Sequence, residues 1–257
     1  MNVFAVGDVV GSVGCLALRT KLPAFRRLKS IDMVIANGEN SADGNGILPS
    51  SARHLFDSGV DVITTGNHVY RRREIYGMLD TNDYLIRPAN YPKSANGKGY
   101  CIIDTCKYKI CIINLMGLLY MEPLRCPFET ADEILDKVKD CKIKIVDFHA
   151  EATSEKRALG LYLDGRVSAF YGTHTHVQTN DAAILEKGTG YITDIGMTGP
   201  VNSVLGIDPD VAISKFIKKM PVRFEVADGP CKINGAIFEI DEKTGKTVSV
   251  ENVEILI

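Results

Sequence analysis

The chain has 257 residues, of which 45% are hydrophobic and 24% are charged, and its formal net charge is −2. This composition is that of an ordinary globular protein, and the length suits one or two domains with a sizeable core. Balanced charge provides no basic field for sequence-independent binding of nucleic acid, so a long nucleic acid is not expected as a partner.

Neither a membrane span nor a secretory leader is indicated. Apolar runs such as residues 3–6 are soon interrupted by charge, far short of the ~18 apolar residues of a membrane helix, and no basic segment follows Met1. The seven cysteines form no C-x-x-C pair and lie mostly within apolar runs, which is typical of buried reduced thiols. We therefore expect a cytoplasmic protein without a membrane partner.

Short β-branched runs alternate with helical stretches along the first two thirds of the chain. The sequence predicts helices at residues 12–29, 51–57 and 71–79, the first capped by Ser12. It predicts strands at residues 3–6, 33–36, 62–65, 143–148 and 167–171. Such alternation is typical of β-α-β units around a buried sheet.

Two further regions have the pattern of antiparallel strands. Residues 99–104 and 109–115, separated by a polar turn, predict a hairpin. The tail is also predicted to be β-rich, with strands at residues 223–226, 232–240 and 248–257. No repeat, linker or low-complexity tract interrupts the chain, so we expect one domain over residues 1–257, built on one mixed sheet or on two stacked sheets.

The most informative residues lie directly after the predicted strands. Five strands end at side chains that can bind a metal ion: Asp8, Glu39 with Asn40, Asn67, His149, and His174 with His176. Because the carboxyl ends of strands in open α/β sheets border the ligand-binding crevice, we expect these side chains to converge. Four of the five histidines lie at or beside these strand ends, a concentration that is hard to obtain by accident.

The donor types indicate a particular kind of metal site. One residue separates His174 from His176, so in an extended segment both imidazoles would point to the same side and grip one ion. Carboxylates, amide oxygens and imidazoles without thiolate suit Mn, Fe or Zn. Seven donors exceed the needs of one ion, so two ions about 3.5–4 Å apart that share a carboxylate are the simplest interpretation. The positive charge left in such a pocket favours a phosphate ester.

The order of these ligands resembles that of the calcineurin-like metallophosphoesterases. Longer strings are similar to the YmdB-like branch of that family, and the similarity spans nearly the whole chain. The strings are Gly7-Asp-Val-Val-Gly11, Asn37-Gly-Glu-Asn40, Asp147-Phe-His-Ala-Glu-Ala-Thr-Ser-Glu-Lys156, Gly172-Thr-His-Thr-His-Val-Gln178 and Tyr191-Ile-Thr-Asp-Ile-Gly-Met-Thr-Gly-Pro200.

The resemblance implies a four-layer α/β sandwich with mixed β-sheets. It implies two divalent or mixed-valence metal ions, Fe or Mn before Zn, with Glu39 bridging them and His68 as the catalytic residue. The ions would activate a water for attack on phosphorus, and His68 would protonate the leaving oxygen. The implied substrates are phosphodiesters, particularly cyclic nucleotides such as 2',3'-cyclic AMP. The implied metal ligands are Asp8, Glu39, Asn40, Asn67, His149, His174 and His176.

The chain departs from the broader family at two positions. The usual D-x-H opening reads Asp8-Val9-Val10, so the place of the missing histidine falls to Asn40. Directly after G-N-H, where the family usually has an acidic residue, this chain has Val69. These departures concern metal affinity and the orientation of His68.

Taken singly, each candidate has a plainer explanation, such as a helix cap or a loop hydrogen bond, and only the joint placement favours a site. His54 lies within a predicted helix and is interpreted as structural. Arg87 precedes a proline and is interpreted as a loop residue rather than a phosphate ligand. Glu155 and Lys156 are expected on an exposed first helical turn.

Two other enzyme classes fit poorly. The glycines of residues 7–14 do not match G-x-G-x-x-G, and the Asp8 carboxylate would oppose a pyrophosphate. The residues after His176 exclude the metallo-β-lactamase pattern H-x-H-x-D-H. A metal-containing nucleotide-sensing regulator with little turnover and a phosphomonoesterase stay open as alternatives, as do the native metal, the physiological substrate and assembly into a homo-oligomer.

Overall fold

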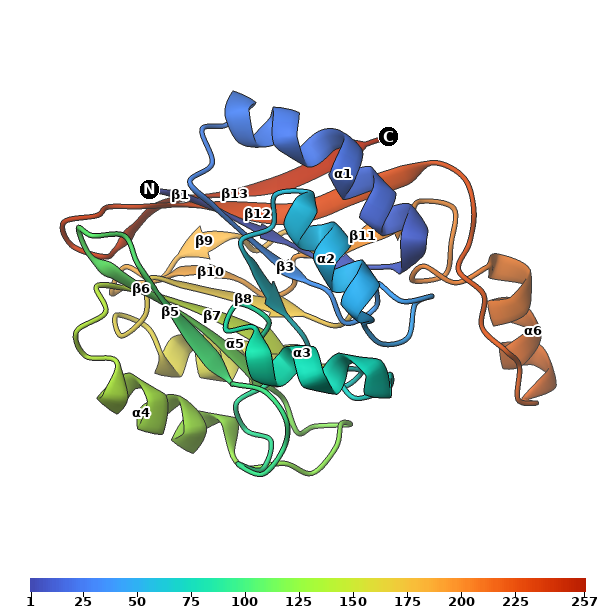
Figure 1. Ribbon diagram of the computed structural model, residues 1–257, viewed down its shortest axis with the longest axis horizontal. Coiled ribbons are helices and arrows are strands. Elements are labelled where there is room, and N and C mark those ends of the chain that lie inside the picture. Colours follow the sequence, from blue (N-terminus) through green and yellow to red (C-terminus); the bar gives the residue numbers. More distant parts are fainter.

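The computed structural model describes all residues from 1 to 257. Two mixed β-sheets pack face to face, and helices cover both outer faces (Figure 1). The expected four-layer α/β sandwich is therefore confirmed, and of the two arrangements left open by the sequence the chain adopts two stacked sheets.

The first sheet supplies three of the predicted ligand-bearing strands. Its seven strands are β1 (Asn2–Val6), β2 (Asp8–Val9), β3 (Met33–Asn37), β4 (Val62–Thr64), β11 (Met197–Pro200), β12 (Cys231–Ile240) and β13 (Thr247–Leu256). β1 pairs in parallel with β3, and β3 pairs in parallel with β4. β12 is antiparallel to both β1 and β13, which confirms the predicted antiparallel tail for these two strands.

The second sheet supplies the other two ligand-bearing strands. Its six strands are β5 (Tyr100–Asp104), β6 (Lys109–Met116), β7 (Ile143–His149), β8 (Ala169–Thr173), β9 (Ala183–Ile184) and β10 (Gly190–Ile192). β6, β7 and β8 are parallel neighbours. β5 is antiparallel to β6, which confirms the predicted hairpin.

The three helices predicted with bounds begin within about two residues of their predicted positions, and further helices follow in the second half of the chain. They are α1 (Gly11–Leu28), α2 (Pro49–Asp57), the short 3₁₀ helix η1 (Arg73–Ile75), α3 (Tyr76–Thr81), α4 (Pro127–Lys137), α5 (Thr153–Tyr162) and α6 (Pro209–Lys218). The predicted cap at Ser12 is wrong, because α1 already starts at Gly11 and Val10 occupies the capping position. None of the helices combines the length and apolar character needed to cross a bilayer.

One predicted strand is absent. Residues 223–226 return from α6 with mostly exposed side chains, and Val226 makes only an isolated bridge to Ile207. The local sequence favours extended backbone there, but no neighbouring strand runs beside it to complete a ladder. An extended segment without such a neighbour is not a strand of a sheet.

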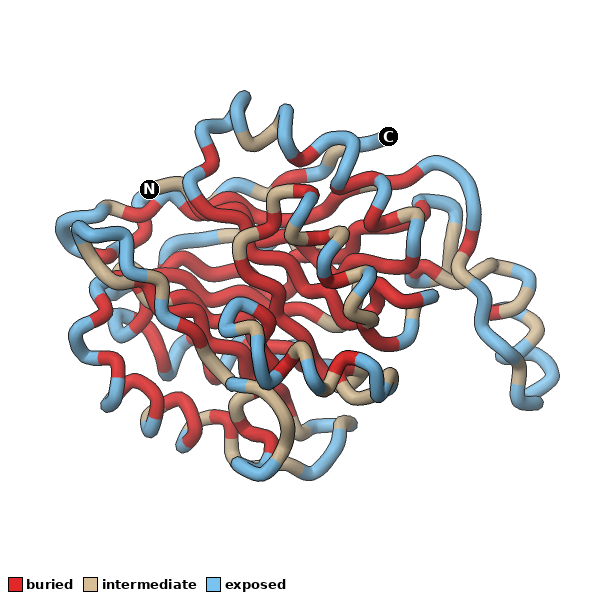
Figure 2. The backbone as a smooth tube through the Cα atoms, viewed as in Figure 1, coloured by how far each residue is buried: buried red, intermediate tan, exposed pale blue.

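Alternation along the strands separates three hydrophobic cores. On β1, Val3 and Ala5 face the core between the sheets, whereas Phe4 and Val6 face the core that includes residues of α1 and α2. A third core joins the second sheet to α4 and α5. Figure 2 shows the buried backbone concentrated along the strands of both sheets. Both sheets are therefore rigidly supported from two sides, and the loops at their carboxyl ends are placed on a fixed base.

Candidate metal centre

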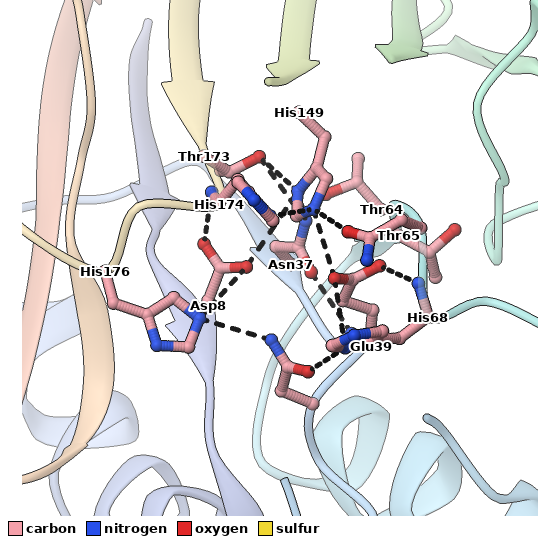
Figure 3. Close-up of polar contacts among 12 residues, drawn as sticks. Asp8, Asn37, Glu39, Thr64, Thr65, His68, His149, Thr173, His174 and His176 are labelled. Carbon is pink, nitrogen blue, oxygen red and sulfur yellow. Dashed lines mark hydrogen bonds and ion pairs between the residues drawn. The ribbon is translucent and has the colours of Figure 1, made fainter. Parts of the chain in front are cut away.

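The predicted ligands come from both sheets. β1, β3 and β4 of the first sheet and β7 and β8 of the second lead into the same cluster of polar side chains (Figure 3). The close approach of the sheets there depends on glycine: a Cβ at Gly66 would lie 2.1 Å from the His149 ring. The structure brings all seven predicted ligands into contacts with one another, in two linked groups.

The first group surrounds His149. Its Nε2 lies 2.9 Å from Asn67 Oδ1, 3.0 Å from His174 Nδ1 and 3.1 Å from Glu39 Oε1. The ligand atoms of Glu39, His149 and His174 all lie within 4.8 Å of one another. A single N–H at Nε2 could not serve all three neighbours, so this group has more acceptors than donors.

The second group contains Asp8, Asn40 and His176. His176 Nε2 lies 3.7 Å from Asp8 Oδ1 and 3.2 Å from the Asn40 amide. Asp8 Oδ1 also lies 3.9 Å from His149 Nδ1, which links the two groups. The orientation of the Asn40 amide follows from its hydrogen-bond contacts, and turning it by 180° would present its oxygen to the same space.

The donor set fits divalent cations. Asp8 Oδ1 and Glu39 Oε1 are fully buried and accept no hydrogen bond, because His149 Nε2, although 3.1 Å from Glu39 Oε1, is not aligned to donate to it. The second oxygen of each carboxylate accepts a backbone N–H, from His174 to Asp8 and from His68 to Glu39. Each carboxylate is thus held by one oxygen, while the other faces the imidazoles. A buried anion without a partner is costly, and a cation between these groups would remove that cost.

Burial also sets the protonation of the imidazoles. It lowers the pKa of His149 to about 4 and, together with the neighbouring His149, lowers the pKa of His174 to about 4. Burial raises the pKa of Asp8. At neutral pH the two histidines are therefore uncharged and each has a lone pair available for a cation.

The predicted extended H-x-H segment is wrong. β8 ends at Thr173, and both His174 (φ 101°) and His176 (φ 63°) adopt positive φ, which side chains other than glycine rarely do. The two imidazoles consequently diverge: His174 faces His149, whereas His176 faces Asp8. The two rings therefore belong to different groups of side chains.

His68 lies at the rim of the centre with a side chain that is 28% exposed. Its Nδ1 is 2.7 Å from Asn40 Oδ1 and 3.6 Å from Glu39 Oε1, and these contacts orient the ring. Val69 is fully buried in the core beneath the first sheet, so an acid at that position would not point toward His68 in this fold. Asn40 is the side chain closest to His68 Nδ1 among the predicted ligands, and it orients the ring in place of residue 69.

A supporting layer of residues was missed by the sequence prediction. Asp147 accepts hydrogen bonds from the hydroxyls of Thr64 and Thr173, and Thr173 Oγ1 lies 3.0 Å from His149 Nδ1. Asn37 Oδ1 accepts the backbone N–H of Glu39. A signal for Asp147 existed, because it is a charged residue in an apolar strand two positions before His149 and so shares its face. Burial raises the pKa of Asp147 to about 8.

Residues set aside in the sequence have distinct outcomes. His54 Nε2 lies 3.2 Å from the Cys15 carbonyl, away from the cluster, in agreement with a structural role. Arg87 is 5% exposed and donates to the carbonyls of Pro88 and Pro92, so it organises its own loop. The prediction that Glu155 and Lys156 are exposed is wrong, since Lys156 is fully buried and Glu155 accepts from backbone N–H groups of the loop after β6.

Known proteins are similar to this chain in sequence and in fold. A family model described as "YmdB-like protein" matches residues 4–253. A 2',3'-cyclic-nucleotide 2'-phosphodiesterase from Bacillus subtilis (strain 168) is 44% identical over 256 residues, covering 99% of this chain and 97% of that protein. A crystal structure of a novel phosphatase from Mycoplasma pneumoniae has 36% identity and a TM-score of 0.95, covering 100% of this chain and 93% of that one.

A more distant likeness concerns the fold alone. The NAD nucleotidase of Haemophilus influenzae has 16% identity and a TM-score of 0.60, covering 100% of this chain and 56% of that one. This arrangement of two stacked mixed sheets is the metallophosphoesterase fold, and the carboxylates and imidazoles at the shared edge could hold a divalent metal ion. Among the proteins with this fold, the chain belongs to the YmdB-like family and is a phosphoesterase.

Proposed function

We propose that this protein is a phosphodiesterase that hydrolyses cyclic nucleotides such as 2',3'-cyclic AMP with the help of two divalent metal ions. The observation that carries the proposal is the pair of buried, unpartnered carboxylate oxygens, Asp8 Oδ1 and Glu39 Oε1, among neutral imidazoles. The name of the B. subtilis relative supports the substrate class. We propose that residues 1–257 form one metallophosphoesterase domain.

We propose that each of the two groups of side chains would hold one ion, and that Glu39 would be a ligand shared by both. Two bound divalent ions would supply Lewis-acid activation of a water and of the phosphoryl oxygens. We propose Fe or Mn, with Zn as an alternative, because the donors are oxygens and imidazole nitrogens. The assigned ligands are Asp8, Glu39, Asn40, Asn67, His149, His174 and His176.

The reaction needs one proton at the leaving group. The oxygen of a water adds to phosphorus while the water gives up a proton to solvent, the bond between phosphorus and the ribose 2' oxygen breaks, and that oxygen takes a proton. We assign the proton to His68. With the Asn40 amide turned so that its N–H donates to Nδ1, the ring hydrogen lies on Nε2, the atom left to reach the substrate. The backbone N–H of the same residue holds Glu39, so proton donor and carboxylate keep a fixed separation.

A substrate screen on metal-defined protein tests the proposal. The protein, stripped with a chelator and reloaded with Mn²⁺ or Fe²⁺, is assayed against 2',3'-cyclic AMP, linear diesters and monoesters, with product identified by chromatography. We expect metal-dependent release of a nucleoside monophosphate from the cyclic substrate. Faster turnover of monoesters would favour the phosphomonoesterase, and stoichiometric nucleotide binding without product would favour the sensing regulator.

A further inference from the structure

A buried ion pair lies behind the loop that carries His174 and His176. Lys156 Nζ on α5 is 2.7 Å from Asp194 Oδ2, and the two side chains are 0% and 1% exposed. Burying such a pair contributes little to stability, since desolvation offsets the attraction and apolar residues of similar volume often stabilise as well or better. Stability alone therefore gives no reason for an ion pair at this position.

The contacts of Asp194 point to a different role. Its Oδ2 accepts both polar hydrogens of Thr175, from the backbone N at 3.1 Å and from Oγ1 at 2.8 Å. Thr175 is the residue between His174 and His176. The other oxygen, Oδ1, accepts from Gly196 N at 2.8 Å, and the Gly196 carbonyl accepts from Asp8 N at 3.1 Å. One carboxylate is thus connected to the loops of three predicted metal ligands.

The loop needs such a restraint. His174 and His176 both have positive φ, a conformation that persists only where the surroundings hold it. Lys156 closes the loop from behind: a Cβ at Gly172 would lie 2.8 Å from its Cδ, so the lysine stem packs directly on the end of β8. Its ammonium fixes the Asp194 carboxylate, which in turn accepts the hydrogen bonds from the backbone N–H and the hydroxyl of Thr175.

We propose that Lys156 and Asp194 are positioning residues of the metal centre, which hold Thr175 so that His174 and His176 point to its two halves. This inference rests on the proposed function, because the pair acts through predicted metal ligands. It assigns a purpose to two buried charges that touch none of the reacting groups themselves.

Mn²⁺ binding by the full-length, metal-stripped protein tests the inference by calorimetry. Thr175→Val removes one hydrogen bond to Asp194, and we expect about 10- to 100-fold weaker Mn²⁺ binding, the usual loss for a residue that supports a ligand. Thr175→Ser keeps the hydroxyl and should restore the affinity. Thr189→Val is the control, because it makes the same substitution at a more deeply buried threonine that does not contact Asp194. Thr189 directly precedes β10, and its hydroxyl donates to the Val167 carbonyl at 2.8 Å.

The outcomes separate the inference from the proposed function. Unchanged Mn²⁺ affinity in Thr175→Val would overturn the inference while the metal centre stands, and a parent that binds no Mn²⁺ would overturn both. An equal loss in Thr189→Val would mean general destabilisation and would also contradict the inference. Lys156→Met combined with Asp194→Asn removes both charges together, and we expect this neutral pair to fold with similarly weakened Mn²⁺ binding; parent-like binding would again overturn it.

Discussion

At the scale of single residues, the centre is built from side chains that each have one atom committed to the protein. Asp8 and Glu39 give one oxygen to a backbone donor and leave the other without a partner. His68 contacts Asn40 through Nδ1 and keeps part of its ring exposed. This division fixes orientation and leaves the remaining atoms for a ligand, as expected of a preorganised site.

Removing the His68 imidazole separates proton donation from metal binding. In His68→Ala we expect kcat for 2',3'-cyclic AMP to fall about 10²- to 10⁴-fold, the typical contribution of a general acid, while metal content stays at the parent level. Steady-state kinetics and elemental analysis of the same preparation measure both. His54→Ala is the matched control, because the His54 imidazole is hydrogen-bonded to the Cys15 carbonyl away from the cluster, and the kcat of this variant should not change. Full activity in His68→Ala would refute the assigned role.

His149 gives a pH-dependent prediction with a definite sign. Its pKa is lowered to about 4 by burial, so in metal-free protein the unfolded state takes up a proton below pH ~6.5 that the folded state refuses. This histidine therefore reduces stability as pH falls from about 6.5 toward 4. Between pH 7.5 and pH 5 the reduction is about 2 kcal/mol, from 1.36 kcal/mol per pH unit over about 1.5 units.

The comparison with His149→Gln isolates this contribution, because other buried groups titrate in both proteins. We expect the stability advantage of the parent over His149→Gln to shrink by about 2 kcal/mol when urea unfolding in chelator is repeated at pH 5 instead of pH 7.5. If the difference in unfolding free energy between the parent and His149→Gln stays constant between pH 7.5 and pH 5, His149 is protonated or accessible in the folded state.

At the scale of elements, the centre depends on how closely the turn after β4 approaches β7. Gly66 lies in that turn and His149 is the last residue of β7, and a Cβ at Gly66 would meet the imidazole at 2.1 Å. Sequence analysis located the strands, since β-branched runs bounded by glycine are local signals. It could not place those strands in two sheets, because which strands pair depends on contacts between residues far apart in the chain.

The Gly66→Ala variant tests whether the turn after β4 must lie this close to β7. The added methyl must displace the His149 ring, so we expect a loss of about 1–3 kcal/mol in unfolding free energy, typical of overpacking, and a strong loss of activity. The control is Gly77→Ala on α3, where a Cβ meets nothing within 4 Å; there we expect unchanged activity and up to about 1 kcal/mol of added stability. Urea unfolding and kcat measure both effects. A Gly66→Ala protein with parent-like values would show that the turn can move away freely.

At the scale of the whole molecule, the sequence predicted which side chains converge better than it predicted how they are arranged. Strand ends followed by polar residues were visible locally, and the seven predicted side chains do come together. The positive φ values of His174 and His176 were not predictable, because they depend on Asp194, which lies 18 or more residues away, and on Lys156 from α5. The same long-range pairing explains why Lys156 was expected on the surface.

Metal removal should affect the stability of the entire fold, because the cluster joins both sheets. Cations bind the folded state only, so each occupied site stabilises it by RT ln(1 + [L]/Kd), about 2.7 kcal/mol at a concentration of 100 Kd. Chelation should therefore lower the melting temperature, and added Mn²⁺ should restore it.

The Glu39→Gln variant should be more stable than the parent without metal and less stable with it. In chelator the substitution removes an unpartnered buried charge, worth about 1–3 kcal/mol, so the variant should melt above the parent. In Mn²⁺ it would lack the carboxylate that we propose the two ions share, and it should melt below the parent. Thermal melts of both proteins in chelator and in Mn²⁺ measure this crossover, and parallel curves without a crossing would contradict a cation between the two sheets.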